Sequence, residues 1–521
     1  MKKLTILFLF VFSVSQSQDL TLSGGTLTIE KTGSLTMSGN FTNNSGTVTL
    51  NSDSNEFAVI KVEGSASGNI TYYRYVNAVG TNEWDLIGSP VDGQSISGFA
   101  STNTSGTATL ATNGSQYAIG VYDNSQDEWT NYTTGTVGAA GNFDIGKGYA
   151  MASVSGGTGL LAFTGTIATT DQTQAIINND AANSGSGRRW DLIANPFPSF
   201  INANDDAHAS NNFLTVNTSK LHDTYEAVYG YDADGSGYTA YNHTYSSNTA
   251  VYIAPGQGFM VASDNTSSDT VSFTEAMQTT SGGDDFISGD IMNNVYEILL
   301  RLYHGDEQIE ETRLYFEEGL SLGLDPGYDA GAFDQNSAIM TRLVEEDEGH
   351  GLAINAMSTD HMDDVVIPLV INQDAGQEFR VNLHTSTIGE VNIYLEDTEL
   401  STLTLLNEED FVLTPASDLS DVGRFYIHLT ADTLSDGDVS TSLLNAYKEV
   451  DTNYITIEGL ATQSTSTQVS LYNILGTKVM DTTLDNNTNT QMISTNGLST
   501  GIYVIKLESG QSQLTKKLII K

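Results

Sequence analysis

One phrase occurs twice in this chain, and it limits the folds available to the middle of the molecule. "EWDLIGSP" at residues 83–90 returns as "RWDLIANP" at 189–196, in a chain with only three tryptophans. Four further landmarks follow in the same order, each displaced by 109 or 110 residues: Tyr122 and Tyr231, Trp129 and Tyr238, Gly146 and Gly256, Phe163 and Phe273. Conserved order and spacing predict two copies of one module, at residues 76–175 and 176–283.

The module reads as β structure. In W-D-L-I the tryptophan and the leucine share one face of a strand, and the proline after it cannot continue the hydrogen-bond ladder. In "GKGY" and "GQGF" the paired glycines relieve steric conflict where a strand bends or where another backbone approaches closely. Strands at this spacing predict a sandwich or a small barrel in each copy. We expect Trp84 and Trp190 to occupy equivalent, largely buried positions.

The remaining segments are also predicted to form β-strands, because they are short apolar runs separated by turns of Gly, Asn, Asp and Ser. In residues 18–75 apolar side chains recur at rung-like intervals, which favours a solenoid-like stack of short strands, with a plain meander as the alternative. Residues 284–435 form another β domain that begins with a long hairpin, and residues 436–443 are a polar linker. The predicted fold class is all-β and multi-domain, with tandem β-sandwich-like modules, an N-terminal solenoid-like segment and a small C-terminal β-sandwich.

The N-terminus is typical of export. Lys2 and Lys3 precede an apolar run too short to span a bilayer, and Ser15 and Ser17 follow it. Residues 1–17 are therefore predicted to be a secretory signal peptide, cleaved after Ser17. Because the chain has no cysteine, its stability comes from core burial, bound ions or partners rather than from disulfides.

Charge is distributed unevenly along the chain. Residues 444–521 hold six lysines and six acidic residues, whereas residues 18–443 hold 12 basic and 58 acidic residues, a net charge of −46. Such a surface repels nucleic acid and anionic lipid. It indicates either adaptation to saline surroundings or a set of cation sites built from carboxylate oxygens.

Three motifs follow one another at the extreme C-terminus: "LYNILGTKV", "GLSTGIYVIKL" and "KKLIIK". In them, residues 444–521 resemble the type A C-terminal sorting domain of the Bacteroidetes type IX secretion system. The motif residues are Leu471, Tyr472, Gly476, Gly501, Tyr503, Lys516 and Lys517. The resemblance implies that the type IX machinery carries the chain across the outer membrane and that the tail is then removed. It further implies that the product is released or attached to surface lipopolysaccharide.

Alternation within the tail predicts an antiparallel sandwich, with Val469 and Leu471, then Ile502 and Val504, facing inward. Residues 18–443 are similar, in their "WDLIGSP…GKGY" modules and their "GLDPGYDAGAF" segment, to multi-domain secreted proteins that carry this sorting domain. No activity follows from that second similarity.

The common catalytic signatures are missing from the sequence. It contains no H-E-x-x-H, no G-x-S-x-G and no P-loop, and thiol chemistry is excluded by the absence of cysteine. His350 and His361 are the closest histidine pair and, with Asp363 and Asp364 beyond them, read as loop ends rather than metal ligands. The acidic run at 345–348 is predicted to be a solvated hairpin tip.

Calcium is the one cofactor that the sequence suggests. Asp232, Asp234 and Ser236 occupy the first, third and fifth positions of a calcium-loop spacing, with Gly237 at the sixth. The twelfth position is His243 instead of a bidentate glutamate, so a plain β-turn is the competing interpretation.

Aromatic side chains supply the candidate ligand site. Trp129 and Tyr132 in the first copy correspond to Tyr238 and Tyr241 in the second, beside polar turns. Exposed rings of this kind stack on sugar faces, while buried ones fill a core.

The sequence thus predicts a non-enzymatic secreted or cell-surface protein that serves adhesion or acts as a binding scaffold. Its expected partners are the type IX machinery, surface lipopolysaccharide, and a polysaccharide or another cell surface, but not nucleic acid. The alternative is a polysaccharide-acting hydrolase or lyase that uses carboxylates not identifiable from sequence.

Overall fold

A computed structural model provides the structure of this chain, with two compact units: residues up to 283 and residues from 296 onward. The predicted signal peptide and linker lie outside the described residues, which are 18–79, 84–105, 109–180, 187–232, 237–243, 250–280, 282–283, 296–389, 391–420, 422–430, 444–448, 453–461, 463–473, 477–510 and 512–520. Within these ranges no helix is long and apolar enough to cross a membrane.

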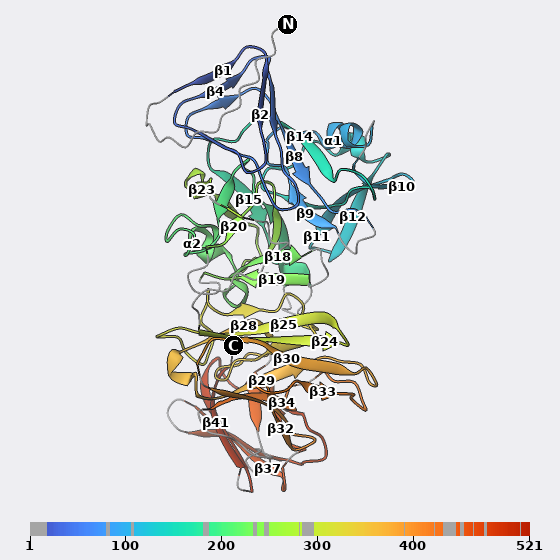
Figure 1. Cartoon of the computed structure of the whole chain (residues 1–521). Coiled ribbons are helices and arrows are strands. Elements are labelled where there is room, and N and C mark those ends of the chain that lie inside the picture. Colours follow the sequence, from blue (N-terminus) through green and yellow to red (C-terminus); the bar gives the residue numbers. More distant parts are fainter. Residues whose placement is uncertain are drawn as a thin grey trace. The chain divides into compact units, whose positions relative to one another are not determined.

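The first segment is a solenoid, as predicted, and not a meander (Figure 1). Its strands pair in parallel, so each returns above the equivalent strand of the previous turn, and Phe41, Leu50 and Ile70 point into the interior. The three stacks are β1 (Leu20–Leu22), β4 (Phe41–Asn43) and β7 (Ala66–Ser67); β2 (Thr26–Ile29), β5 (Thr47–Leu50) and β8 (Ile70–Tyr75); β3 (Ser34–Met37) and β6 (Val59–Val62).

The two copies of the module share one strand order, which confirms the tandem β-sandwich-like architecture. Copy 1 has β9-β13-β11-β12 in one sheet and β14-β8 in the other, and copy 2 has β16-β21-β18-β19 and β22-β15. The elements of copy 1 are β9 (Asp85–Gly88), α1 (Ile96–Asn103), β10 (Thr112–Asn113), β11 (Gln116–Asp123), β12 (Glu128–Thr133), β13 (Gly148–Met151) and β14 (Leu160–Gly165). Those of copy 2 are β15 (Gln172–Ile176), β16 (Trp190–Ala194), β17 (Phe200–Asn202), α2 (Phe213–Asn217), β18 (Val228–Asp232), β19 (Gly237–Tyr241), β20 (Tyr252–Ile253), β21 (Gly258–Ala262), β22 (Asp269–Phe273) and β23 (Gln278–Thr279).

Strand pairing also shows how each copy begins. β8 pairs with β14, and β15 pairs with β22, so each copy contains a strand that begins before its predicted border: all of β8 precedes residue 76, and β15 begins at Gln172, before residue 176. In copy 1 this strand is shared, because β8 is also the last parallel strand of the solenoid. Trp190 is 2% exposed, whereas Trp84, just before β9, is only half-buried against the core.

A short helix in each copy ends on an asparagine that fixes the second sheet. Asn103 Nδ2 donates to Ala162 O at 3.1 Å, and Ala162 N–H donates back to Asn103 Oδ1 at 2.8 Å. Asn217 makes the same pair of bonds with Ser272, at 3.0 and 2.8 Å. Because a buried amide requires partners, these reciprocal bonds tie each helix to β14 or β22.

The glycine pairs of the repeat mark the contact between the copies. Gly88 N–H donates to Gly256 O, and the equivalent Ala194 N–H donates to Gly146 O, both at 2.8 Å. A Cβ added at Gly148 would lie 2.5 Å from Leu192 Cγ and 2.9 Å from the backbone oxygen of Ile193, too close for any side chain. The contact is therefore approximately two-fold symmetric, and the glycine of "GKGY" admits the backbone of the other copy.

The second unit opens with one 11-stranded sheet, in which β24, β25 and β28 run side by side (Figure 1). Strands near both ends of the sheet contribute side chains to one core. Leu395 of β31 and Phe411 of β33 pack in the same cluster as Ile298 of β24 and Leu314 of β25. The predicted hairpin is β24 with β25. The strands are β24 (Tyr296–His304), β25 (Glu307–Phe316), β26 (Ala330–Gly331), β27 (Ile339–Thr341), β28 (Leu352–Met357), β29 (Asp364–Ile371), β30 (Phe379–Ser386), β31 (Asn392–Asp397), β32 (Thr402–Leu405), β33 (Phe411–Leu413) and β34 (Phe425–Thr430).

The tail is a small sandwich of two sheets, β35-β36-β39 and β38-β37-β40-β41, as predicted. The predicted inward face of β40 is wrong: Ile502 is 44% exposed and Val504 is only half-buried, and Tyr503, Ile505 and Leu507 face the core instead. The strands are β35 (Asn445–Lys448), β36 (Tyr454–Glu458), β37 (Thr467–Asn473), β38 (Lys478–Leu484), β39 (Gln491–Ser494), β40 (Gly501–Ser509) and β41 (Ser512–Ile520). Short 3-10 turns elsewhere in the chain cover Val137–Ala139, Gly187–Arg189, Thr218–Lys220, Asp223–Tyr225, Glu275–Met277 and Thr359–His361.

Candidate functional site

An exposed indole lies on the β11–β12 hairpin of copy 1. Trp129 is 44% exposed and pairs across the hairpin with Tyr122, with ring centroids 5.1 Å apart. The Tyr122 hydroxyl lies 2.8 Å from Asp127 Oδ1 and 2.6 Å from Gly187 O, and burial together with the Asp127 carboxylate raises the pKa of Tyr122. The ring beneath the indole is therefore neutral and fixed in place. Such an aromatic surface is preorganised for stacking.

The four candidate aromatics do not form one surface. Tyr132 lies three residues after Trp129, so it faces the other side of the sheet and packs against the core of copy 1. Tyr241 packs in the same way against the core of copy 2. Tyr238 pairs with Tyr231 at 4.9 Å, as Trp129 pairs with Tyr122, but it is partly buried, and burial raises its pKa.

The calcium candidate falls largely outside the described residues. Asp234 and Ser236 belong to that part of the chain, and Asp232 is described only through its backbone, which pairs with Gly237. Among the described residues, no group of three His, Asp or Glu has metal-binding geometry, and this includes the His350 and His361 region. A calcium site at 232–236 remains a prediction.

His243, the residue at the twelfth position of that spacing, lies between two carboxylates. Its Nδ1 is 3.1 Å from Asp205 Oδ1, and its Nε2 is 3.0 Å from Glu226 Oε1. Burial lowers the pKa of His243, but the two carboxylates outweigh it and raise the pKa overall. Both ring nitrogens are occupied, so in this geometry the ring cannot activate a hydroxyl as it would in a catalytic triad. Sequence analysis missed this cluster because its members lie up to 38 residues apart.

The acidic run at 345–348 is not the solvated tip that was expected. Asp347 is 2% exposed, and its carboxylate binds Arg342 at 3.0 Å. An arginine five residues earlier folds back over the loop, and a buried carboxylate requires such a partner. The prediction was wrong because it treated the run in isolation.

The sorting motif residues are divided between core and surface. Leu471 and Tyr503 are buried, and the Tyr503 hydroxyl donates to Ser499 O at 2.8 Å. Tyr472 is half-buried, Gly501 begins β40, and Gly476 lies outside the described residues. Lys516 and Lys517 lie on β41, the first buried and the second ion-paired to Glu346.

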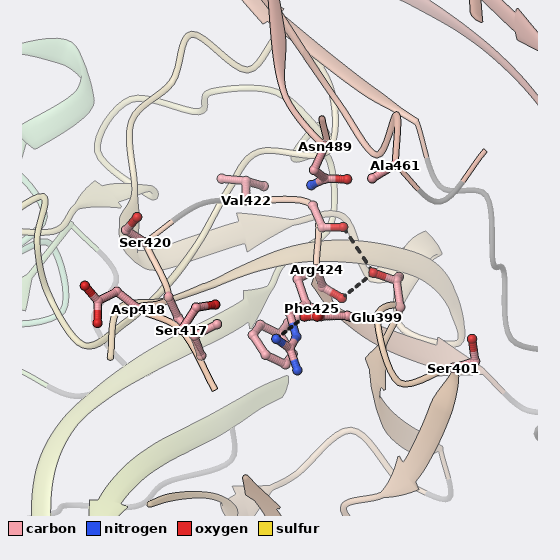
Figure 2. Close-up of a pocket in the computed structure, with 13 residues that line it drawn as sticks. Glu399, Ser401, Ser417, Asp418, Ser420, Val422, Arg424, Phe425, Ala461 and Asn489 are labelled. Atoms are coloured by element: carbon pink, nitrogen blue, oxygen red, sulfur yellow. Dashed lines mark hydrogen bonds and ion pairs between the residues drawn. The ribbon is translucent and has the colours of Figure 1, made fainter. Parts of the chain in front are cut away.

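A half-open cleft of about 540 Å³ lies in the second unit, lined on one side by Ser417, Asp418 and Ser420 and on another by Ala461 and Asn489 of the tail (Figure 2). Arg424 lies in this cleft, but Asp397 already holds its guanidinium through contacts of 3.0 and 2.7 Å, and Glu399 also pairs with it. Its charge is thus balanced within the chain. The cleft offers hydrogen-bonding groups, including the carboxylates of Glu399 and Asp418, and Glu399 is already paired with Arg424.

Comparison with known families assigns both parts of the chain. A family model described as a domain of unknown function, DUF8693, matches residues 11–429. The chain belongs to this family. A second model, described as a secretion system C-terminal sorting domain, matches residues 451–521. This match confirms the resemblance of the tail, so the DUF8693 protein is a type IX secretion substrate that interacts with that machinery and is exported across the outer membrane.

Other comparisons add little. No curated protein matches the chain. A solved structure titled "Biofilm associated protein - BSP domain" covers 87% of this chain and 96% of its own, at 8% identity and a TM-score of 0.17. Similarity at that score carries no argument about fold or function.

Proposed function

We propose that the exported DUF8693 protein is a non-enzymatic binding or adhesion protein whose Trp129 ring stacks on a saccharide. The observation that carries the proposal is the 44% exposure of Trp129 above the fixed ring of Tyr122. Of the three tryptophans in the chain, Trp190 is buried and Trp84 is half-buried. An indole held at the surface by another ring supplies contact area without a large loss of side-chain entropy.

Charge narrows the ligand class. Asp127 and Glu128 stand beside the ring, and residues 18–443 carry a net charge of −46. An anionic polysaccharide would approach against this field. Neutral or amino sugars fit better, since carboxylate and amide oxygens accept hydrogen bonds from their hydroxyl and amino groups.

Several buried acids that would otherwise be candidates for hydrolysis already have structural partners. Glu226 binds His243, Asp347 binds Arg342, and Asp397 binds Arg424. Each of these carboxylates balances a basic group in the fold. These three carboxylates are therefore not free to act as a general acid or base.

The test uses the secreted protein on immobilised neutral, amino and anionic polysaccharides, scoring both retention and released sugar. Trp129→Ala is expected to abolish retention on the bound polysaccharide while leaving the Tm unchanged. Tyr296→Ala, which removes another exposed aromatic side chain, is the matched control and is expected to bind normally. Release of reducing ends or unsaturated sugar would favour the hydrolase or lyase alternative, and retention that survives Trp129→Ala would refute the proposed site.

A further inference from the structure

A loop of the β domain contacts the sorting domain within the second unit. The loop, residues 342–349, follows β27, and its Arg342 guanidinium lies 4.5 Å from the centroid of the Tyr447 ring on β35. Asp347 holds the guanidinium from one side at 3.0 Å, and the Tyr447 hydroxyl donates to Glu458 Oε1 at 2.9 Å. Both Arg342 and Tyr447 are buried, at 6% and 8% exposure. A desolvated cation over an aromatic face is among the stronger contacts of its kind.

The same loop also engages the last strand of the tail. Glu346 forms an ion pair with Lys517 on β41. The neighbouring Lys516 is buried, with its Nζ 3.1 Å from Asn445 Oδ1. Burial lowers the pKa of Lys516, and the nearby Asp347 carboxylate opposes that shift.

Close backbone approach shows that the two domains fit together away from this loop as well. A Cβ added at Gly423 in the β domain would lie 3.3 Å from Glu458 Cβ and 3.4 Å from Asn489 Nδ2 in the tail. An added side chain would thus be crowded by the tail at Gly423, which also lines the cleft in Figure 2 together with Asn489 of the tail. The contact is therefore extended and not a single ion pair.

We propose that residues 342–349 are a docking site for the chain's own sorting domain, residues 444–521, and that the docked tail stays bound after the linker is cut. Local charge complementarity supports this occupant, because Glu346 of the loop pairs with Lys517 of the tail, and the Asp347 carboxylate lies near the buried Lys516. Lys517 is then engaged by the cargo before the machinery reaches it. Removal of the tail exposes Arg342 and Asp347, so the exported form acquires a surface that the precursor lacks.

The experiment places a specific protease site within residues 436–443 of the full-length protein, cuts it, and follows the tail by gel filtration. The tail is expected to co-elute with the cargo at low salt and to separate as salt screens the ion pairs. Tyr447→Leu removes the ring but keeps an apolar side chain, and is expected to weaken the complex roughly tenfold. Glu346→Lys is expected to weaken it about fivefold.

Charge exchange separates specific docking from general attraction. Adding Lys517→Glu to Glu346→Lys is expected to restore the affinity lost by Glu346→Lys alone. Lys506→Glu is the matched control, since Lys506 pairs with Glu508 inside the tail at 2.7 Å and does not meet the loop. Immediate separation of the cut tail at low salt, or an equal loss from Lys506→Glu, would overturn the proposal.

Discussion

The three tryptophans of the chain provide a graded test of the structure, because they differ in burial. Trp190 is 2% exposed, with its ring centroid 5.5 Å from that of Tyr225 and 4.6 Å from that of Tyr229. Burying an aromatic side chain removes about 150–250 Å² from water, which at about 25 cal/mol per Å² gives an upper estimate of ~4–6 kcal/mol. Trp190→Ala also leaves a cavity, and such truncations cost about 3–5 kcal/mol of unfolding free energy.

Trp84→Ala and Trp129→Ala provide comparisons for the loss of unfolding free energy in Trp190→Ala. Trp84 occupies the equivalent place in copy 1 but is less completely buried, so Trp84→Ala is expected to cost less than Trp190→Ala. Trp129→Ala is expected to cost less than about 1 kcal/mol, because its ring is already in contact with water. The order of destabilisation is therefore Trp190, then Trp84, then Trp129.

Hydrogen exchange is the suitable assay, because a chain of several domains need not unfold in one step. Amides of β21 and β22 report copy 2, and those of β13 and β14 report copy 1. If Trp190→Ala lowered the protection free energy of β21 by less than about 1 kcal/mol, the ring would not be part of the core.

Three further predictions concern pH, cations and export. Burial raises the pKa of Asp191 to about 7, so the folded state binds the carboxyl proton more tightly than the unfolded state does. The contribution of Asp191 to stability therefore falls as pH rises from about 4 to 7. Asp191→Asn is expected to flatten that part of a Tm-versus-pH curve. If Asp232, Asp234 and Ser236 bind calcium, a chelator lowers the Tm by several degrees and sodium chloride does not restore it, whereas equal rescue by sodium indicates screening of the −46 charge. Deleting residues 444–521 is expected to leave a folded protein in the periplasm, and fusing them to a signal-bearing reporter to export it; normal export of the truncated protein would contradict the assignment.

The sequence predicted the module because its landmarks are side chains with strict requirements. Gly148 has no room for a Cβ beside Leu192, and the Asp191 carboxylate accepts from Ile177 N–H at 2.9 Å, so these positions tolerate few substitutions. β8 and β15 are equivalent only through backbone pairing, and "ITYYRY" and "QTQAI" share no pattern. The first strand of each copy was therefore not visible as part of the repeat.

The errors in the sequence analysis have physical causes. In β40 the run "GIYVIKLES" is apolar at both strand phases near its start, and only its later residues, Lys506, Leu507 and Glu508, reveal which face is buried. His243 gains its partners from residues 17 and 38 positions away, a distance at which no local pattern operates. Local spacing predicted strands and turns, but not the charge pairs that fold across them.

The symmetry of the two copies bears on how strongly one chain can bind. Reciprocal bonds from Gly88 to Gly256 and from Ala194 to Gly146 hold the copies as one body, so the β11–β12 hairpin presents Trp129 in a fixed orientation. The equivalent ring in copy 2 is the partly buried Tyr238, so the duplication does not double the exposed indole. Under the proposed function the described parts of the two copies present one exposed indole, and adhesion then depends on the density of chains at the surface, because simultaneous weak contacts multiply through effective concentration. Retention of a soluble polysaccharide on a protein-coated surface should accordingly rise steeply with the density of immobilised chains, while the affinity of a monomeric chain for a short oligosaccharide should stay weak and fit a single site. Two equal sites per chain would show instead that the copies act as a pair. In that case binding would be lost when Trp129→Ala and Tyr238→Ala are combined, but not with either substitution alone.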